Sequence, residues 1–186
     1  MNYFISDLHL GHKNSLKFDN RPFNTIEEQD KFIIENWNKI ITDEDDIYIL
    51  GDFSWYKAAK TIEIYSNLKG KKHLIVGNHD HKLLKCKEVK DLFVEIVDYK
   101  ELYINKSTAI VLCHYPILFY RNAHRGWYHF YGHLHNDNYY NMILKFQNEI
   151  KDNEKENSDY NYDYDYNNGK IIVKDNNINN IINMFN

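Results

Sequence analysis

The sequence has few cysteines, no long hydrophobic run and no strong excess of charge of one sign. Its two cysteines, Cys86 and Cys113, form no CxxC pair, which argues against a disulfide scaffold or a cysteine-rich structural zinc site. No apolar run approaches the roughly 20 residues that span a bilayer. The start of the chain, MNYFISDLHLGHK, lacks the basic region of a signal peptide. A net charge of −4 gives no support for a protein that coats nucleic acid or lies on a membrane. We therefore expect a soluble, cytoplasmic protein.

The length and the composition fit one globular domain. The chain has 186 residues, of which 43% are hydrophobic and 16% aromatic, so it can bury a substantial core. No segment reads as a convincing linker, although DNEKEN begins a polar stretch that we expect to be a loop over residues 152–159. We predict a single domain over residues 1–186.

Short apolar runs rich in β-branched and aromatic residues predict buried strands. They lie at residues 3–5, 47–50, 73–76, 109–113 and 127–131. A helix is predicted between the first two, because Thr25 and Glu28 form a capping box. Five apolar residues follow on one helical stripe, namely Phe32, Ile33, Trp37, Ile40 and Ile41. A second helix is predicted to end at Gly70. Strands that alternate with helices predict an α/β fold with parallel strands at its centre.

The pattern is weaker in the C-terminal part. Residues 139–150 fit either a strand or a helix. Tyr160, Tyr162, Tyr164 and Tyr166 alternate with polar residues, which predicts a half-buried strand with KIIV at 170–173 as its hairpin partner. A low-complexity tail is the alternative.

An Asp, Asn or His follows each of the five predicted strands. The groups are DLH at 7–9, GD at 51–52, GNHD at 77–80, HYP at 114–116 and GHLH at 132–135. Ligands of open α/β sheets bind at the carboxyl ends of the strands, and glycine lets the backbone turn tightly there. One such group would mean little, but five in succession predict a functional site.

The residue types at these positions suit a metal centre. Carboxylate, amide and imidazole groups without thiolate favour Mn²⁺, Fe or Zn²⁺ at a catalytic site. The candidate ligands outnumber what one ion needs, so we expect two ions that share a bridging carboxylate. The candidates are Asp7, His9, Asp52, Asn78, His114, His133 and His135.

In order and approximate spacing, these motifs resemble the calcineurin-like metallophosphoesterase family. The segments SDLHLGHKN, RPF, NWN and HLIVGNHD are similar to its compact bacterial and phage branch. The resemblance implies a two-sheet α/β/β/α sandwich with a dimetal site at the strand ends, which would hold Mn²⁺, with Fe, Zn²⁺ or Ni²⁺ as other candidates. Many members continue the GD motif with a further Asp or Arg, whereas this chain reads GDFSW at 51–55.

The resemblance also implies a role for each residue of the motifs. His79 would protonate the leaving group, and Asp80 would orient and charge its ring. Asp52 would bridge the two metals. The other ligands would be Asp7, His9 and His135 for the first metal, and Asn78, His114 and His133 for the second.

The expected activity is that of a dimetal phosphohydrolase. A dimetal-bound hydroxide would attack a phosphoester in line, with phosphodiesters favoured as substrates and nucleotides among them. A phosphomonoesterase, a nucleotide pyrophosphatase and a metal-binding protein-interaction scaffold are the alternatives. Stable binding of nucleic acid is not expected, and the sequence does not set the oligomeric state. Four side chains are candidates for substrate contact, namely Arg21, Arg121, His124 and Arg125.

Overall fold

The computed structural model describes residues 1–135 and 138–155. Their contacts divide them into two compact units, Met1–His133 and a second unit that begins at Leu134. The first unit contains both sheets and nearly all the predicted site residues. The expectation of a single domain stays a prediction.

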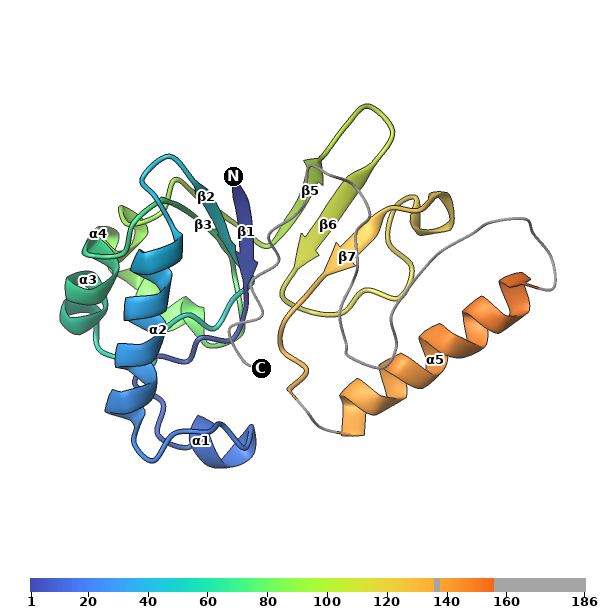
Figure 1. Ribbon diagram of the computed structural model, residues 1–186. Helices are drawn as coiled ribbons and strands as arrows, with labels where there is room; N and C mark the ends of the chain where they lie inside the picture. The colour runs from blue at the N-terminus through green and yellow to red at the C-terminus, as the bar shows by residue number, and fades with distance from the viewer. Residues whose placement is uncertain (136–137, 156–186) are drawn as a thin grey trace. The chain divides into compact units, whose positions relative to one another are not determined.

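The first sheet has four parallel strands in sequence order. They are β1 (Asn2–Ile5), β2 (Asp46–Ile49), β3 (Lys71–Ile75) and β4 (Glu95–Val97). Right-handed crossovers between neighbouring parallel strands place all the connecting helices on one face. Figure 1 shows α2, α3 and α4 on that face. The carboxyl ends of β1, β2 and β3 therefore lie side by side at one edge, with no helix between them.

The helices of the first unit cover the apolar core. They are α1 (Ser15–Phe18), α2 (Ile26–Ile40), α3 (Ala58–Ser66) and α4 (Lys87–Lys90), with the 3₁₀ helix η1 (Asp80–Lys85) before α4. The predicted capping box starts α2, since the Glu28 N–H donates to Thr25 Oγ1 at 3.2 Å and the Thr25 N–H to Glu28 Oε2 at 3.3 Å. Of the predicted apolar stripe, Ile33, Trp37 and Ile41 are buried, whereas Phe32 and Ile40 are exposed. Both helices expected from the sequence are confirmed, although α3 ends at Ser66 and not at Gly70 as predicted.

A second, mixed sheet packs against the free face of the first. It consists of β5 (Tyr99–Tyr103), β6 (Ala109–Cys113) and β7 (Tyr128–Phe130), with β5 antiparallel and β7 parallel to β6. The 3₁₀ helix η2 (Ala123–Arg125) precedes β7. The Phe4 ring of β1 meets the Phe130 ring of β7 edge-on at 5.0 Å, so the two sheets contact each other. All five predicted strands and the two-sheet α/β class are confirmed.

The second unit contains α5 (Asn138–Lys155), which settles the ambiguity at residues 139–150 as a helix. Our prediction of a loop over 152–159 was wrong for residues 152–155, which continue α5. Glu and Lys are good helix formers, so a polar composition did not exclude a helix there. The rest of that loop and the predicted tyrosine strand and KIIV hairpin lie outside the described residues. The outer helical layer of an α/β/β/α sandwich stays a prediction.

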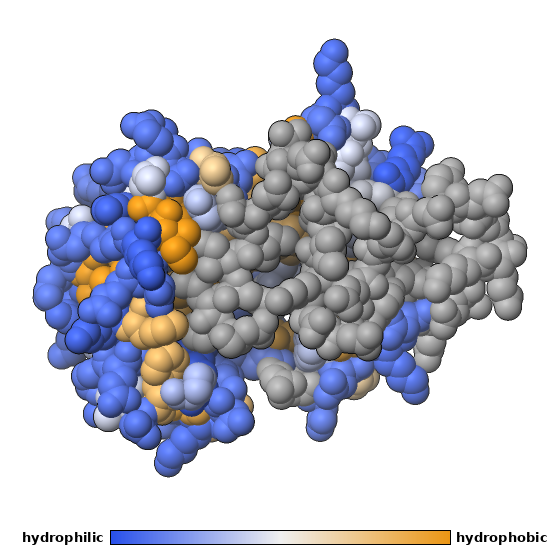
Figure 2. Space-filling model, viewed as in Figure 1, coloured by the Kyte–Doolittle hydropathy of each residue, from blue (hydrophilic) through white to orange (hydrophobic). Residues whose placement is uncertain are grey.

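The coloured part of the face drawn in Figure 2 is largely hydrophilic. On the face drawn in Figure 2, hydrophobic residues form small separate patches among the coloured residues. Among the helices that the structure describes, none is both long enough and apolar enough to cross a membrane.

Candidate metal centre

The loops that follow β1 and β2 are joined by backbone hydrogen bonds beyond the ends of the strands. The Asp7 N–H donates to the Gly51 carbonyl at 3.1 Å, and the His9 N–H donates to the Asp52 carbonyl at 2.9 Å. The Gly132 N–H, after β7, donates to the His114 carbonyl, after β6, at 3.0 Å. The two sheets thus hold their ligand-bearing loops in fixed register.

Unusual backbone angles are concentrated at the predicted ligands. Positive φ angles occur at Asp7 (51°), His9 (48°), Asp52 (55°) and His133 (67°). A left-handed conformation at a non-glycine residue costs of order 1–3 kcal/mol, although Asp and His tolerate it better than most residues. Such a cost persists where the surrounding structure fixes the residue, which is common at functional sites.

Three glycines of the motifs leave the space that the ligand side chains occupy. A Cβ atom on Gly51 would collide with the His114 ring, and one on Gly77 with the Asp52 carboxylate. A Cβ on Gly132 would collide with the Asp7 carboxylate and would lie 2.9 Å from the Leu50 carbonyl oxygen. Any larger residue at these positions would displace a predicted ligand.

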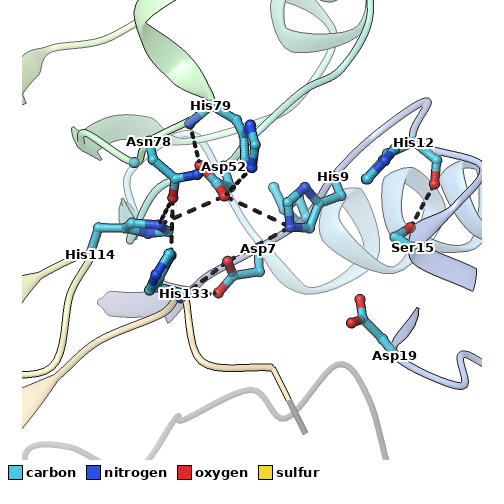
Figure 3. Close-up of polar contacts among 12 residues, drawn as sticks. Asp7, His9, His12, Ser15, Asp19, Asp52, Asn78, His79, His114 and His133 are labelled. Carbon is cyan, nitrogen blue, oxygen red and sulfur yellow. Dashed lines mark hydrogen bonds and ion pairs between the residues drawn. The ribbon is translucent and has the colours of Figure 1, made fainter. Parts of the chain in front are cut away.

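Asp52 lies at the centre of the cluster. Figure 3 shows it between His9 on one side and His114 with Asn78 on the other. Asp7, Asp52 and His114 each offer one ligand atom, and these atoms all lie within 4.8 Å of one another. Asp52 Oδ2 lies 3.7 Å from His114 Nε2 and 3.9 Å from His9 Nε2. These distances are too long for hydrogen bonds but are compatible with two atoms that bind one ion at about 2.0–2.2 Å each.

The charge of Asp52 also favours a cation. Its side chain is 2% exposed, and within the described residues no lysine or arginine forms an ion pair with it. A buried carboxylate without a cationic partner is costly. Two divalent ions held as the motifs suggest would supply the missing positive charge, so the residues present fit the metals.

A second group of predicted ligands converges on one point, and it consists of His114, Asn78 and His133. His114 Nδ1 lies 2.7 Å from the Leu50 carbonyl oxygen, which fixes a proton on Nδ1 and directs Nε2 inward. His114 Nε2 is 2.9 Å and His133 Nδ1 is 3.0 Å from Asn78 Oδ1. These are the three residues that we predicted for the second metal.

The first predicted metal has two of its three ligands in the first unit. His9 Nε2 lies 3.8 Å from Asp7 Oδ1. The backbone N–H of His133 donates to both oxygens of the Asp7 carboxylate, at 3.2 Å to Oδ1 and 3.1 Å to Oδ2. His135 is a described residue two positions beyond the end of the first unit. Its role as the third ligand stays a prediction.

Asp80 has a different role from the one we expected. Its carboxylate is fully buried and accepts three backbone N–H groups, from Gly77 at 2.7 Å, Asp52 at 2.9 Å and Phe53 at 3.1 Å. The pKa of Asp80 is raised to about 6, chiefly by burial and also by the charge of Asp52, against the lowering effect of these N–H donors. No hydrogen bond to the His79 ring is present within the described residues. Asp80 therefore joins the loops after β2 and β3 rather than orienting the imidazole.

His79 lies at the border of the cluster. Its backbone N–H donates to Asp52 Oδ1 at 2.9 Å, while its ring Nε2 is 3.9 Å from Asp52 Oδ2. The side chain is 43% exposed, so a substrate can reach its ring. The indole of Trp55 lies 4.2 Å from the imidazole, centroid to centroid.

The four substrate-contact candidates lie apart from this cluster or serve its scaffold. The buried Arg21 side chain donates to the carbonyl oxygens of Asp7 at 2.8 Å and Leu8 at 3.1 Å and pairs with Asp19. Burial lowers the pKa of Arg21, against the raising effect of Asp19. Arg121 pairs with Glu101 at 2.9 Å on the second sheet. His124 and Arg125 are exposed on η2. Substrate contact by these residues stays a prediction.

Sequence reasoning missed two aromatic residues at the site. Trp55 contacts His79 and also stacks on His12, and Tyr115 lies edge-on to His114 at 5.0 Å and to His133 at 4.8 Å. Each follows a ligand within three positions along the chain, and that proximity was the only signal available.

The comparisons with known proteins identify a structural relative. The crystal structure of the protein of unknown function AQ665 from Aquifex aeolicus is 31% identical to this chain, with a TM-score of 0.53. The match covers 83% of this chain and 74% of that one. The chain belongs to the same family as AQ665.

Two curated relatives match shorter parts of the chain. The uncharacterized protein MJ1445 of Methanocaldococcus jannaschii is 46% identical over 80 residues, which cover 42% of this chain and 46% of that protein. The gene 66 protein of Mycobacterium phage D29 is 28% identical over 128 residues, which cover 61% of this chain and 63% of that protein. The matches thus span roughly half the length of these relatives. No family model matches the chain.

Proposed function

We propose that this chain is a metal-dependent phosphoesterase of the calcineurin-like type, with phosphodiesters as its favoured substrates. Asp7 and His9, with His135, would hold one ion. Asn78, His114 and His133 would hold the other, and Asp52 would bridge them. The names of these relatives state no activity, so the proposal rests on the site.

One observation carries the proposal. Asp52 is a buried carboxylate that three imidazoles face at 3.7–3.9 Å, and Asp7 and Asn78 border the same space. A cluster of carboxylate, amide and imidazole groups without thiolate is typical of a catalytic centre with open metal positions. When bound, two ions there would make a water more acidic and neutralise phosphoryl oxygens.

The residues of the chain supply the remaining steps. The loops fix the ligands before substrate arrives, so little reorganisation is needed during the reaction. As the oxygen of a water bonds to phosphorus, the opposite P–O bond breaks and its electron pair stays on the leaving oxygen. The exposed His79 ring then gives its proton to that oxygen, and the water loses a proton to solvent. General-acid help matters most for poor leaving groups, which favours diesters.

The direct test is hydrolysis of bis(p-nitrophenyl) phosphate by the purified chain with added Mn²⁺, beside p-nitrophenyl phosphate. We expect turnover of the diester that a chelator abolishes and Mn²⁺ restores. Faster turnover of the monoester would favour a phosphomonoesterase. If neither ester is hydrolysed although metal analysis finds two bound ions, the scaffold alternative would replace the proposal.

His79→Ala separates catalysis from metal binding. We expect this variant to bind two ions per chain as before while kcat falls roughly 10²–10⁴-fold, the usual contribution of a general acid. Loss of metal from the variant would show that His79 is a ligand and not the acid.

A further inference from the structure

The orientation of the His79 ring needs a cause other than Asp80. The Asp80 carboxylate is engaged by three backbone N–H groups. The backbone N–H of His79 is held by Asp52, but this bond leaves rotation about the side-chain bonds free. A general acid has to keep its nitrogen within hydrogen-bond reach of the leaving oxygen. A half-exposed imidazole without a fixed partner would satisfy this only part of the time.

Trp55 is the large side chain packed on that ring. The two ring centroids are 4.2 Å apart with an interplanar angle of 54°. On the indole, His12 stacks almost parallel, at 4.0 Å and 9°. His9, a predicted metal ligand, is 5.7 Å away. The indole therefore touches the proposed acid and borders the proposed metal site.

Hydrogen bonds hold the backbone at Trp55 in place. Its backbone N–H donates to the Leu10 carbonyl at 2.8 Å, next to the bridge that pairs Leu10 with Ser54. The Ser54 hydroxyl bonds to Thr61 at 2.9 Å, and the Tyr56 hydroxyl donates to Asp30 at 2.7 Å. Because Ser54 and Tyr56 on either side are hydrogen-bonded, the backbone that carries the indole is held in place. The indole can therefore restrain another ring.

We propose that Trp55 is the positioning residue of the general acid, holding the His79 imidazole toward the leaving-group oxygen. This inference rests on the proposed function, because it assigns a partner to the acid of that mechanism. Aromatic ring pairs attract each other beyond the effect of the area they bury. A modest restraint of this kind is enough, since a displacement of about 1 Å can cost roughly 10²-fold in rate.

The experiment compares two leaving groups. The substrates are the p-nitrophenyl and the phenyl esters of thymidine 5′-phosphate, of which phenolate leaves less readily and depends more on the acid. With Trp55→Ala, we expect kcat for the phenyl ester to fall roughly 10–100-fold. We expect the loss for the p-nitrophenyl ester to be at least several-fold smaller, and KM and the number of bound ions to stay unchanged. Trp55→Phe should recover most of the rate, because a flat ring is retained.

A double variant tests whether Trp55 acts through His79. If it does, Trp55→Ala adds no further loss in the His79→Ala background, since the acid is already absent. Proton NMR gives a readout independent of turnover. Indole ring currents should shift the ring protons of His79, and Trp55→Ala should remove that shift. Phe18→Ala is the matched control, because Phe18 is an exposed aromatic residue that contacts His12 at 6.4 Å but has no contact with His79 among the described residues.

Several outcomes would overturn the inference. Equal losses with both esters, multiplicative losses in the double variant, or loss of metal from Trp55→Ala would each show that Trp55 acts by another route. Failure of the proposed function looks different, because the unmodified protein with its metals bound would then hydrolyse neither ester.

Discussion

At the scale of single residues, the site depends on positions where ordinary backbone geometry is given up. Left-handed φ angles occur at Asp7, His9, Asp52 and His133. Among the described residues, the other non-glycine residues with such angles are Asn20 and Asn122. Asparagine accepts this conformation in ordinary turns, but four of the predicted ligands adopt it within one cluster. The backbone thus points ligands at a common centre, and the hydrogen bonds between the loops hold it there.

Gly132 provides a test at this scale. In Gly132→Ala the new methyl group would collide with the Asp7 carboxylate, so we expect metal affinity to fall roughly 10–100-fold, as when the support of a ligand is lost. Titration with Mn²⁺, followed by metal analysis of the purified variant, measures the effect. Gly126→Ala is the control, since Gly126, with a positive φ of 80°, ends η2 and belongs to none of the ligand motifs. Equal affinities in the two variants would contradict the role of Gly132.

At the scale of elements, the sequence was most informative where local signals were strong. Thr25 and Glu28 marked the start of α2 correctly, and buried apolar runs marked the strands that carry the ligands. The short strands β4 and β5 were missed. Their residues, such as Glu95 and Lys100, are half-buried and partly charged, so no clear periodicity distinguished them. Residues 152–155 were misread because composition alone does not separate a solvated helix from a loop.

The contacts of His129 on β7 predict that the stability of the fold depends on pH. His129 on β7 lies with Nδ1 3.0 Å from the Val111 carbonyl oxygen, and its Nε2 accepts the Ile117 N–H at 2.9 Å. Burial lowers the pKa of His129 from its usual 6.5, against the raising effect of its backbone contacts at Val111 and Tyr115. Only the neutral ring can accept from Ile117, so protonation breaks a bond that holds the loop after β6.

The lowered pKa of His129 sets the direction in which the free energy of unfolding changes with pH. The stabilisation is complete above pH 6.5, where both the folded and the unfolded chain carry a neutral His129, and it is lost as pH falls through the lower folded value. We expect the free energy of unfolding to decrease by about 0.5–1.5 kcal/mol from this group between neutral and acidic pH. Urea unfolding at several pH values measures it. His129→Gln keeps an acceptor that does not titrate, so its pH dependence should be shallower. Identical slopes in the two proteins would contradict the assignment.

At the scale of the whole molecule, the site was predictable because it is assembled from sequence-local motifs at strand ends. The structure gathers Asp7, His9, Asp52, Asn78, His114 and His133 into one cluster, as the motifs indicated. The contacts of Asp80 and Trp55 were not predictable. Neighbours in sequence need not contact each other, and the His79 ring packs on a residue 24 positions earlier in the chain, on a different loop. Such long-range pairs depend on the tertiary fold, for which a single sequence gives no local signal.

The arrangement of the ligands couples metal binding to the stability of the fold. Asp7, Asp52 and Asn78 follow strands of the first sheet, while His114 and His133 follow strands of the second. Ions bound among them would join the two sheets, and the unfolded chain has no such site. A ligand that binds only the folded state at 100 times its Kd stabilises it by about 2.7 kcal/mol. For a chain of this size we expect Tm to rise by roughly 5–10 °C.

Thermal unfolding with Mn²⁺ and with a chelator measures this coupling. Asp52→Asn should abolish most of the rise in Tm, because a neutral amide at the centre weakens both predicted metal positions at once. Asp98→Asn removes an exposed carboxylate between β4 and β5 and should leave the rise intact, which excludes a general effect of net charge. If Asp52→Asn is stabilised by Mn²⁺ as much as the unmodified protein, the ions bind elsewhere and Asp52 is not the bridging ligand. A full response in Asp98→Asn together with none in Asp52→Asn would place the coupling at the junction of the two sheets.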